Sequence, residues 1–531
     1  MTTIAPYRSG LRPGRDGFAQ LLRAEWTKFR TVRGWIIGMI VAILVMVALG
    51  LLTPASDSSG CQASGGVPQS GGSCQGSAPA FPLGQGGEPV YDSFYFVHQP
   101  LAGAGSITVR ITSLTGRAGV VHSSDGNSYG SPGIQPWTKA GVIIKQNLNS
   151  GSAYAAMMVT HDHGVRLQWD YTGDTAGLSG SVGVTDPRWL RLTRSGDVIT
   201  GYDSADGTHW TRVGTVTLSG LPATVQAGLF TASPDWVKSY GHGSSRGPTQ
   251  ATGVFDHLTL ADGWSARPWS AGFVGQGLSD SGGIGEYHEA GGQLTVTGSG
   301  DIAPLVAGHG GMADSDQIIP NYLIGTFAGL IALAVVAAMF ITGEYRRRLI
   351  RTTLAASPRR GRVLAAKAIV IGAVSFVAGL TGAGAAVVIG LKITQSRGNY
   401  EFPAPWTTDA RVIAGTGLLA AVAAVLILAI GAILRRGAAT IAVAIVAIVV
   451  PYFLSVTGAV PLGPADWLLR VTPAAGFALQ QPYPEYSQVA ANYSPISGYY
   501  PLAPWAGFLV LCAWTALALA GALYVLRRRD A

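Results

Sequence analysis

The stretch WIIGMIVAILVMVALGLL, residues Trp35–Leu52, decides the fold class, because it is wholly apolar and carries no charged residue. A helix needs about 20 predominantly apolar residues to cross the hydrocarbon core of a membrane. The apolar core of a cleaved signal peptide is shorter, at about 7 to 15 residues. The stretch therefore predicts a retained transmembrane anchor, and we place this first helix at residues 34–53.

Five further runs of the same kind lie in the last two-fifths of the chain, so the sequence predicts six membrane spans in all. Spans two to six fall within residues 320–531. Ionisable residues inside a span would mark an ion or proton path, and the predicted spans contain essentially none. That composition disfavours a proton-coupled secondary transporter. The five runs are Tyr322–Thr342, Ala368–Leu391, Val412–Leu434, Ala438–Leu454 and Ala506–Leu526.

The basic residues predict how the spans are oriented, since loops rich in Lys and Arg stay in the cytoplasm. Such residues gather in residues 1–33, in Arg346–Arg362, at Arg435 and Arg436, and in Arg527–Arg529. All four clusters agree. We expect a multi-pass protein of the plasma membrane with both termini cytoplasmic and residues 54–319 outside.

The charge of the chain is divided between these two sides. The whole chain has a formal net charge of +8, yet residues 54–319 hold 12 Lys and Arg against 20 Asp and Glu. A nucleic-acid-binding protein would need a basic face on its soluble part. The basic residues here lie beside the spans instead, so topology explains them and no nucleic-acid partner is expected.

Residues 54–90 are rich in Gly, Ser, Pro and Gln and bury too little apolar surface to fold alone, which predicts a linker. Cys61 and Cys74 lie in it and are the only cysteines outside the predicted spans. An oxidising compartment would permit a disulfide between them. The alternative is two free thiols in a tether. Cys512, in the last predicted span, reads as a small packing residue.

Residues 91–262 change to short β-branched and aromatic runs separated by Gly, Asp and Asn turns, which is the pattern of strands. Eight such runs predict an all-β jelly roll or sandwich inserted between helices 1 and 2. Residues 263–319 are either extra strands or a stalk. The runs are Ser106–Thr112, Ala140–Lys145, Ala153–Thr160, Val165–Tyr171, Trp189–Arg194, Asp197–Tyr202, Thr224–Thr231 and Val254–Leu260.

Three segments in this region resemble the concanavalin A-like domains of bacterial surface proteins: Pro136–Gln146 (PWTKAGVIIKQ), Trp189–Asp197 (WLRLTRSGD) and the expected hairpin Tyr202–Trp210. Domains of this kind often bind carbohydrate or peptide. Aromatic rings can stack on sugars, although alternating aromatics in strands are more often core. The ligand-binding candidates are Trp137, Trp169, Tyr171, Trp189 and Trp236.

The sequence gives only weak support for catalysis or metal binding in this domain. A glycoside hydrolase needs two carboxylates at a defined separation, and Glu286 and Glu289 lie in a Gly-rich region where a solvated loop explains them better. His161 and His163 flank a turn, and two histidines alone are a weak metal signal. We expect no catalytic residue and no metal site.

The membrane part carries further motifs in LLRAEWTKFRTVRGW (21–35), TGEYRRRLIRTTLAASPRRGRVLAAKA (342–368), WLLRVTPAAGFALQQ (467–481) and the terminal LRRRDA (526–531). Together they resemble the type-2 ABC transporter permease family of high-GC bacteria. The resemblance implies a six-helix permease that acts as a homodimer or heterodimer with a cytoplasmic ABC ATPase. It also implies an interfacial helix at Phe18–Val32 and a re-entrant segment at Ala465–Gln480.

The resemblance further implies that the loop after the second span docks on the ATPase. Simple topology anchoring is the alternative for its arginines. A large external domain departs from the family, whose first external loop is usually short. The docking candidates are Glu344, Tyr345, Arg346, Arg359 and Arg360.

Nucleotide chemistry is expected on another chain, because an ATPase needs a GxxxxGK[ST] loop and the sequence has no Gly-Lys dipeptide. We therefore expect no cofactor in this chain, with ATP and magnesium on the partner ATPase. The leading hypothesis is a non-enzymatic permease subunit of an ATP-driven exporter with an external lectin-like domain for ligand or cargo. The alternatives are a non-transporting receptor or adhesin, and a membrane-bound glycoside hydrolase.

Overall fold

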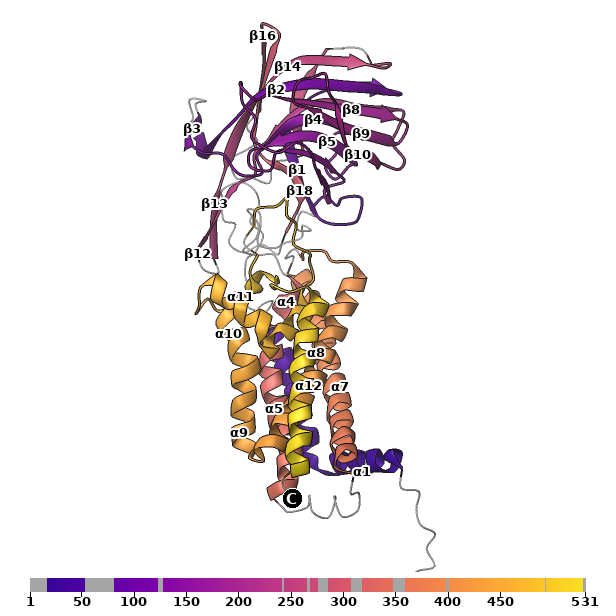
Figure 1. Ribbon diagram of the computed structural model, residues 1–531, viewed down its shortest axis with the longest axis vertical. Coiled ribbons are helices and arrows are strands. Elements are labelled where there is room, and N and C mark those ends of the chain that lie inside the picture. The colour runs from indigo at the N-terminus through magenta and orange to yellow at the C-terminus, as the bar shows by residue number, and fades with distance from the viewer. Residues whose placement is uncertain are drawn as a thin grey trace, which may run out of the picture.

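The computed structural model is an elongated bundle of helices with a domain of sheets at one end (Figure 1). Helix α1 (Phe18–Thr31) lies across the opposite end of the bundle. The structure describes residues 17–52, 81–122, 128–240, 243–264, 268–275, 285–306, 318–346, 359–397, 401–491 and 493–528. Cys61 and Cys74 lie outside the described residues.

Six helices of the described chain are long and apolar enough to cross a membrane, which confirms the six predicted spans. The second is broken near its start and the fifth changes to a π-helical turn in its middle. Two shorter helices follow the fifth span, in the region expected to be re-entrant: α11 (Leu462–Val471) and η2 (Pro473–Gln480). The spans are α2 (Arg33–Gly50), α4 and α5 (Ile319–Tyr322 and Thr326–Arg346), α7 (Arg360–Ser396), α8 (Trp406–Leu434), α9, η1 and α10 (Gly437–Ala444, Ile445–Val449 and Val450–Val456), and α12 (Pro504–Arg528).

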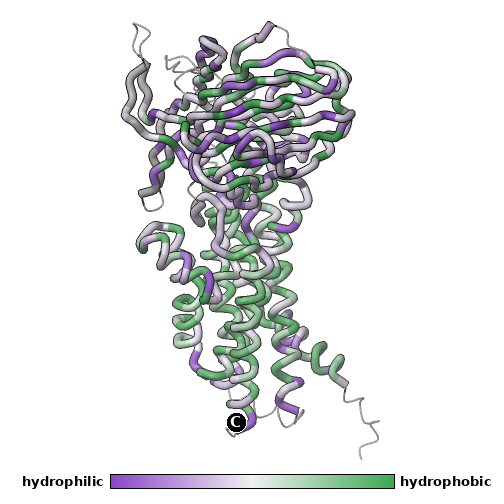
Figure 2. Tube along the Cα trace, turned by 45° about the horizontal axis from the view of Figure 1, so that its top comes forward, coloured by the Kyte–Doolittle hydropathy of each residue, from purple (hydrophilic) through white to green (hydrophobic). Residues whose placement is uncertain are grey.

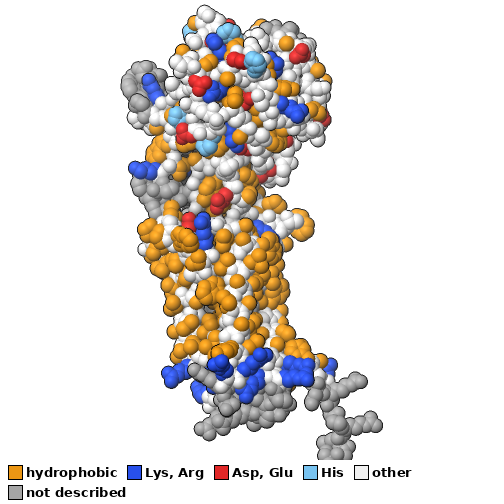
Figure 3. All heavy atoms as spheres, viewed as in Figure 1, with side chains coloured by type: hydrophobic (Ala, Val, Ile, Leu, Met, Phe, Trp, Pro, Cys, Tyr) orange, Lys and Arg blue, Asp and Glu red, His pale blue; other side chains and the backbone are white. Residues whose placement is uncertain are grey.

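The outside of the bundle is apolar along most of its length, as a lipid-facing surface must be. Figure 2 shows the helices of the bundle coloured mostly as hydrophobic, whereas hydropathy alternates along the strands. Figure 3 shows Lys and Arg gathered at the end of the bundle where α1 lies, opposite the sheets. The distribution of charge matches the one used to predict the topology.

Two eight-stranded antiparallel sheets make up the inserted domain, which lies between α2 and α4 in the sequence as predicted. A separate hairpin of β12 (Trp236–Tyr240) and β13 (Gly243–Gly247) reaches toward the helices (Figure 1). The first sheet has the order β15 (Ser270–Val274), β1 (Val90–Ala102), β11 (Thr224–Ala232), β4 (Lys139–Lys145), β5 (Tyr154–Thr160), β6 (Val165–Trp169), β7 (Gly173–Ala176), with β18 (Asp301–Pro304) beside β1. The second has β10 (Thr211–Thr217), β9 (Val198–Ser204), β8 (Arg188–Ser195), β2 (Gly105–His122), β14 (Thr249–Ala261), β17 (Gln293–Gly298), β16 (Gly285–Ala290), with β3 (Ser128–Pro132) beside β2.

The two sheets share one apolar core, so the domain is a sandwich. Alternate residues of each strand enter this core, for example Val142 from β4, Leu229 from β11 and Leu190 from β8, all fully buried. All eight predicted runs overlap strands of these sheets. Strands β15 to β18 belong to the same two sheets, so the sandwich continues to Pro304.

The two ends of the sandwich meet where it joins the bundle. Strands β1 and β18 pair antiparallel, and the Leu305 amide donates to the Pro89 carbonyl at 2.8 Å. Two buried lysines of β4 hold these strands. Lys145 binds Asp92 of β1 at 2.7 Å, and Lys139 binds Asp301, the first residue of β18, at 2.6 Å.

The sandwich rests on the segment 481–500, which connects η2 to α12. Tyr91 of β1 and Leu305 share a buried apolar cluster with Tyr483 and Val489 of that segment and with Phe402. The Tyr483 hydroxyl donates to the Phe402 carbonyl at 2.7 Å. The sandwich is therefore packed directly against the membrane part.

Candidate functional site

Helix α1 is amphipathic and fastened to the bundle by its inner face. Phe29 is 4% exposed and packs against Trp35 and Phe340, with ring centroids 5.9 and 5.8 Å apart. On the outer side Phe18 and Trp26 are exposed. Such a helix suits the boundary between a membrane and water, where the rings sink into the lipid headgroups.

A cluster of four charges lies beneath α1 and joins it to two spans. The Lys367 ammonium of α7 lies 2.6 Å from Glu25 of α1 and 2.7 Å from Glu344 of α5. Lys28 of α1 lies 2.8 Å from Glu25 and 3.1 Å from Glu344. We call Glu25, Lys28, Glu344 and Lys367 the charge cluster. Each carboxylate thus contacts both ammonium groups.

Three members of the charge cluster are almost completely removed from water. The side chains of Glu25, Lys367 and Glu344 are 0%, 1% and 9% exposed, and that of Lys28 is 40% exposed. Burial by itself lowers the pKa of Lys28, but the carboxylates of Glu25 and Glu344 outweigh burial, so that pKa is raised. Buried charges are tolerated only when they are paired. The arrangement therefore locks α1, α5 and α7 to one another.

The residues expected to dock an ATPase differ in how accessible they are: Glu344 is buried, Tyr345 and Arg360 are half-buried, and Arg346 and Arg359 are exposed. Glu344 is buried in the charge cluster and offers little surface to a partner. Tyr345 is half-buried, with the Arg435 guanidinium 5.2 Å from the centre of its ring. Arg346 and Arg359 are exposed, and Arg360 donates to the Leu526 carbonyl at the end of α12. Residues 347–358 lie outside the described chain.

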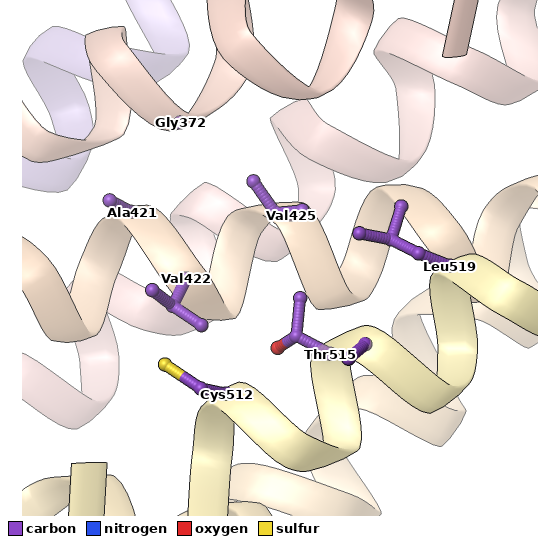
Figure 4. A pocket seen from close by; sticks show the side chains of 8 residues that line it. Gly372, Ala421, Val422, Val425, Cys512, Thr515 and Leu519 are labelled. Atoms are coloured by element: carbon purple, nitrogen blue, oxygen red, sulfur yellow. The ribbon is translucent and has the colours of Figure 1, made fainter. Parts of the chain in front are cut away.

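An apolar cavity of about 300 Å³ lies between α7, α8 and α12. Figure 4 shows Val422 of α8 directed toward Cys512 of α12, and the Thr515 side chain directed toward α8. The Thr515 hydroxyl is already used, because it donates to the Leu511 carbonyl at 2.8 Å. The cavity therefore suits a hydrocarbon chain and not a polar cargo. Its lining residues are Gly372, Ala421, Val422, Val425, Cys512, Thr515, Ala516 and Leu519.

In the sandwich, the predicted ligand-binding aromatics are mostly used internally. Tyr171 is 1% exposed, and Trp137 is 5% exposed and stacked on His163 at 3.8 Å. Trp169 is half-buried against the sandwich core, and Trp236 of the β12 hairpin lies over Gly247. Tyr171 and Trp137 therefore have little free face for a sugar, whereas Trp169 and Trp236 are only partly covered.

Trp189 is partly exposed, like Trp169 and Trp236, and it also lies beside charged side chains. The Arg110 guanidinium lies 5.6 Å from its ring centre, and Arg110 pairs with Asp256 at 2.6 Å. That hydrogen-bonded pair holds the pKa of the Asp256 carboxyl below its usual value. The His257 ring stands edge-on to Trp189 at 5.3 Å, and Gly207 lies flat against the indole.

A polar hollow of about 520 Å³ opens next to Trp189. Strand β14 bulges after Asp256, and His257 has the left-handed φ of +52°, which is unusual for a residue other than glycine. Gly291 and Gly292 form the opposite wall at the turn between β16 and β17. We call Arg110, Trp189, Asp256, His257 and Gln293 the Trp189 patch.

The carboxylates and histidines considered for catalysis or metal binding lie at or near the surface of the sandwich. Glu286 and Glu289 are exposed on β16, where Glu289 accepts from Tyr287 at 2.7 Å. His161 and His163 lie in the turn after β5. Within the described ranges, no group of three or more His, Cys, Asp or Glu residues is placed to hold a metal ion.

The family comparison covers both the membrane part and the inserted sandwich. The model of the ABC-2 family transporter proteins matches residues 21–531, from α1 to the end of the chain. The chain belongs to the ABC-2 transporter family. As an ABC-2 transporter it is a multi-pass membrane protein. The comparison with curated proteins found no match.

Solved structures resemble only a part of this ABC-2 transporter. A scytalido-glutamic peptidase is 9% identical, and the match covers 40% of this chain and 100% of the peptidase with a TM-score of 0.24. A GH43 protein of Bacillus licheniformis is 16% identical, over 30% of this chain and 28% of that one, with a TM-score of 0.19. An alginate lyase of Klebsiella pneumoniae is 11% identical, over 30% and 61%, with a TM-score of 0.18. At these values the likeness does not extend to a shared activity.

Sequence reasoning missed the partners of Glu344 and the neighbours of Trp189 in this ABC-2 transporter. Lys367 is an ionisable residue near the start of the apolar helix α7, and that position alone is a signal for a buried pair. His257 had no signal, because its place depends on the bulge in β14.

Proposed function

We propose that this ABC-2 transporter chain is the permease subunit of an ATP-driven exporter, with the α1 end of the bundle in the cytoplasm. A separate ATPase docks at that end, around Arg346 and Arg359, and a second permease completes the membrane path. The charge cluster is the observation that carries this proposal most directly. It supports the proposal because its helices α5 and α7 flank residues 347–358, the expected docking loop.

The charge cluster gives the docking loop a mechanical role. A displacement of the loop moves the ends of α5 and α7, and the buried pairs of Lys367 carry that movement to α1. Pulling the groups apart would leave unpaired charges away from water, which costs about 3–5 kcal/mol for a broken buried pair. The three helices therefore move as one body when the ATPase closes.

The docking proposal is tested by purifying the affinity-tagged full chain from the cells that produce it. A polypeptide with a GxxxxGK[ST] loop should co-purify, together with ATP hydrolysis. Replacing exposed Arg359 (Arg359→Glu) should weaken the association about tenfold, equivalent to about 1.4 kcal/mol. The matched control is Arg212→Glu, which reverses an exposed arginine on β10 of the sandwich.

Two results would contradict the docking proposal. One is the absence of any nucleotide-binding partner, which would favour the receptor or adhesin hypothesis. The other is equal loss of the partner in the Arg359→Glu and Arg212→Glu chains, which would place docking elsewhere. The Glu344→Gln change is unsuitable as a docking test, because Glu344 is buried and acts through Lys367 and Lys28.

For the external domain we propose binding of a glycan at the Trp189 patch. A half-exposed indole beside preset polar groups is the combination that recognises a sugar ring and its hydroxyls. Asp256 is already fixed by Arg110, so the patch is ordered without a ligand. The exposed His257 and Gln293 remain to bind hydroxyl groups across the hollow.

The glycan proposal is tested on the full chain in lipid nanodiscs with an array of microbial and plant oligosaccharides. At least one oligosaccharide should bind, and the combined change His257→Ala and Gln293→Ala should weaken it about tenfold or more, by about 1.4 kcal/mol. The control is Trp236→Ala, on the separate hairpin. Binding that is lost in the control but kept in the double variant would contradict this site.

A further inference from the structure

The turn between β6 and β7 has an unfavourable backbone. Asp170 and Tyr171 follow one another with φ of +43° and +62°, the left-handed region that favours glycine. A bulky aromatic residue in this region is a genuine outlier. Such strain persists only where the surrounding structure fixes it, and it often marks a functional contact.

A buried polar network fixes the Tyr171 side chain. Its hydroxyl donates to Asp92 at 2.6 Å and accepts from the Lys145 ammonium at 3.2 Å. The Lys145 ammonium also donates to Asp92 and to the Ser152 carbonyl. Asp92 and Lys145 are the residues that hold strand β1 where the sandwich meets the bundle. The strained turn is thereby tied to the junction between the two domains.

The backbone of the turn faces the membrane part. The Gln488 amide donates to the Tyr171 carbonyl at 3.2 Å, and Gln488 is 4% exposed. Tyr486, in the same 481–500 segment, packs against the buried cluster that contains Tyr91 of β1. Burial raises the pKa of the Glu88 carboxyl, and the charge of Asp170 raises it further. The 481–500 segment and the turn therefore exclude water from each other.

The other end of the 481–500 segment is fixed to the spans. Gln480, the last residue of η2, donates to Thr326 of α5 at 3.0 Å and to Thr416 of α8 at 3.1 Å. The Gln481 carbonyl accepts from Arg411 of α8 at 2.7 Å. One short segment thus connects the strained turn of the sandwich to η2 and to two spans.

We propose that the Asp170–Tyr171 turn is the contact through which the external domain sets the position of η2. The turn is held rigidly by its buried network, so a displacement of the sandwich moves the Tyr171 carbonyl and with it Gln488. The 481–500 segment then transmits that displacement to Gln480 of η2. Removing the contact frees both partners, so η2 and the turn become mobile together. A role of this contact in transport rests on the proposed permease function. The coupling between the turn and η2 is independent of that function.

Hydrogen exchange followed by mass spectrometry on the full chain in nanodiscs tests the proposal. The Gln488→Ala change should speed amide exchange severalfold in two separate places, the turn region 165–176 and the η2 region 473–480. The matched control is Gln20→Ala, an exposed glutamine on α1, and neither region should change in it. Exchange that rises only beside residue 488 overturns the proposal.

A second variant keeps the test decisive if the Gln488→Ala chain fails to fold. Tyr171→Phe preserves the ring and its packing but removes the contacts with Asp92 and Lys145, and it should produce the same paired increase. An increase at the turn without one at η2 would reduce the network to a local role and overturn the coupling. Neither measurement uses nucleotide or an ATPase, so a failure here is distinct from a failure of the exporter assignment.

Discussion

Lys367 lies near the start of the apolar helix α7, where two carboxylates from other helices stabilise its charge. Its ammonium is 1% exposed and lies between Glu25 and Glu344. Lys28 contacts the same carboxylates but keeps much of its hydration, since it is 40% exposed. The two lysines make the same type of contact in very different surroundings, which allows their contributions to be compared directly.

Replacing Lys367 by Met should destabilise the chain by about 3–5 kcal/mol, because two carboxylates remain buried and lose a partner. The Lys28→Met change should cost only about 0–1 kcal/mol, as expected of an exposed pair. The midpoint of thermal unfolding in detergent measures both. Equal shifts for the two variants would show that burial does not control the strength of the charge cluster.

Glu401, between α7 and α8, gives the chain a pH dependence near neutrality. Burial, and then the charge of Asp409, raises its pKa to about 7, so its protonated form favours the folded state. The contribution is complete below the ordinary value of 4.5 and is lost as pH rises through about 7.

Thermal stability should therefore fall between pH 5 and pH 8, and Glu401→Gln should flatten that profile by about 5 °C. The negative charge of Asp409 acts on Glu401. The charge of Glu401 acts in turn on the hydroxyl groups of Tyr322 and Tyr483. Asp186→Asn is the control, because Arg188 holds the pKa of that exposed carboxyl below its usual value. A profile that keeps its slope in the Glu401→Gln chain would contradict the assignment.

At the scale of helices and strands, local composition was sufficient to predict what crosses the membrane. Trp35–Leu52 needs only its own apolar residues to become α2, and Ala140–Lys145 needs only its β-branched run to become β4. The distribution of Lys and Arg predicts which way these elements point. This prediction places the two ends of the bundle on opposite sides of the membrane. One thiol-reactive reagent that cannot cross the membrane is enough to test it.

Topology is tested by cysteine labelling in a chain whose three native cysteines are replaced by serine. Ser195→Cys, at the exposed turn after β8, should react with a membrane-impermeant maleimide in intact cells. Ala438→Cys, exposed at the start of α9, should react only after the cells are permeabilised. Labelling of both sites in intact cells, or the reverse order, would overturn the proposed orientation.

The partners of the buried polar groups could not be predicted from local patterns. Glu25 and Lys367 are 342 positions apart, and Tyr171 and Gln488 are 317 apart. The family resemblance implies that Glu344 begins a docking loop, yet its partners Lys28 and Lys367 come from other segments. Trp189 and Tyr171 both fit alternating strands, and only the packing of the sheets shows which ring is covered.

For the molecule as a whole, the sandwich is an insertion whose two ends touch. The Leu305 amide and the Pro89 carbonyl are hydrogen-bonded, so residues 90–304 begin and end at one place. The membrane part therefore needs no rearrangement to close the gap if those residues are removed.

Joining Pro89 to Leu305 through two glycines should leave a chain that still inserts its six spans and still binds the proposed ATPase partner. The proposed glycan binding should disappear, and the 481–500 segment should exchange faster because Gln488 has lost its partner. Membrane extraction, ATPase co-purification and hydrogen exchange measure these outcomes. Loss of membrane insertion would show that the sandwich is required for the bundle to fold.

The charge cluster has one more consequence, which concerns the membrane potential. A charge that crosses the whole membrane field does electrical work of about 2.3 kcal/mol per 100 mV. Glu25, Glu344, Lys28 and Lys367 carry two charges of each sign, so a rigid shift of the charge cluster along the membrane normal moves no net charge. The charge cluster itself therefore adds no voltage dependence to a motion of α1, α5 and α7, whereas in the Lys367→Met chain the cluster carries an uncompensated negative charge and its shift along the membrane normal responds to voltage.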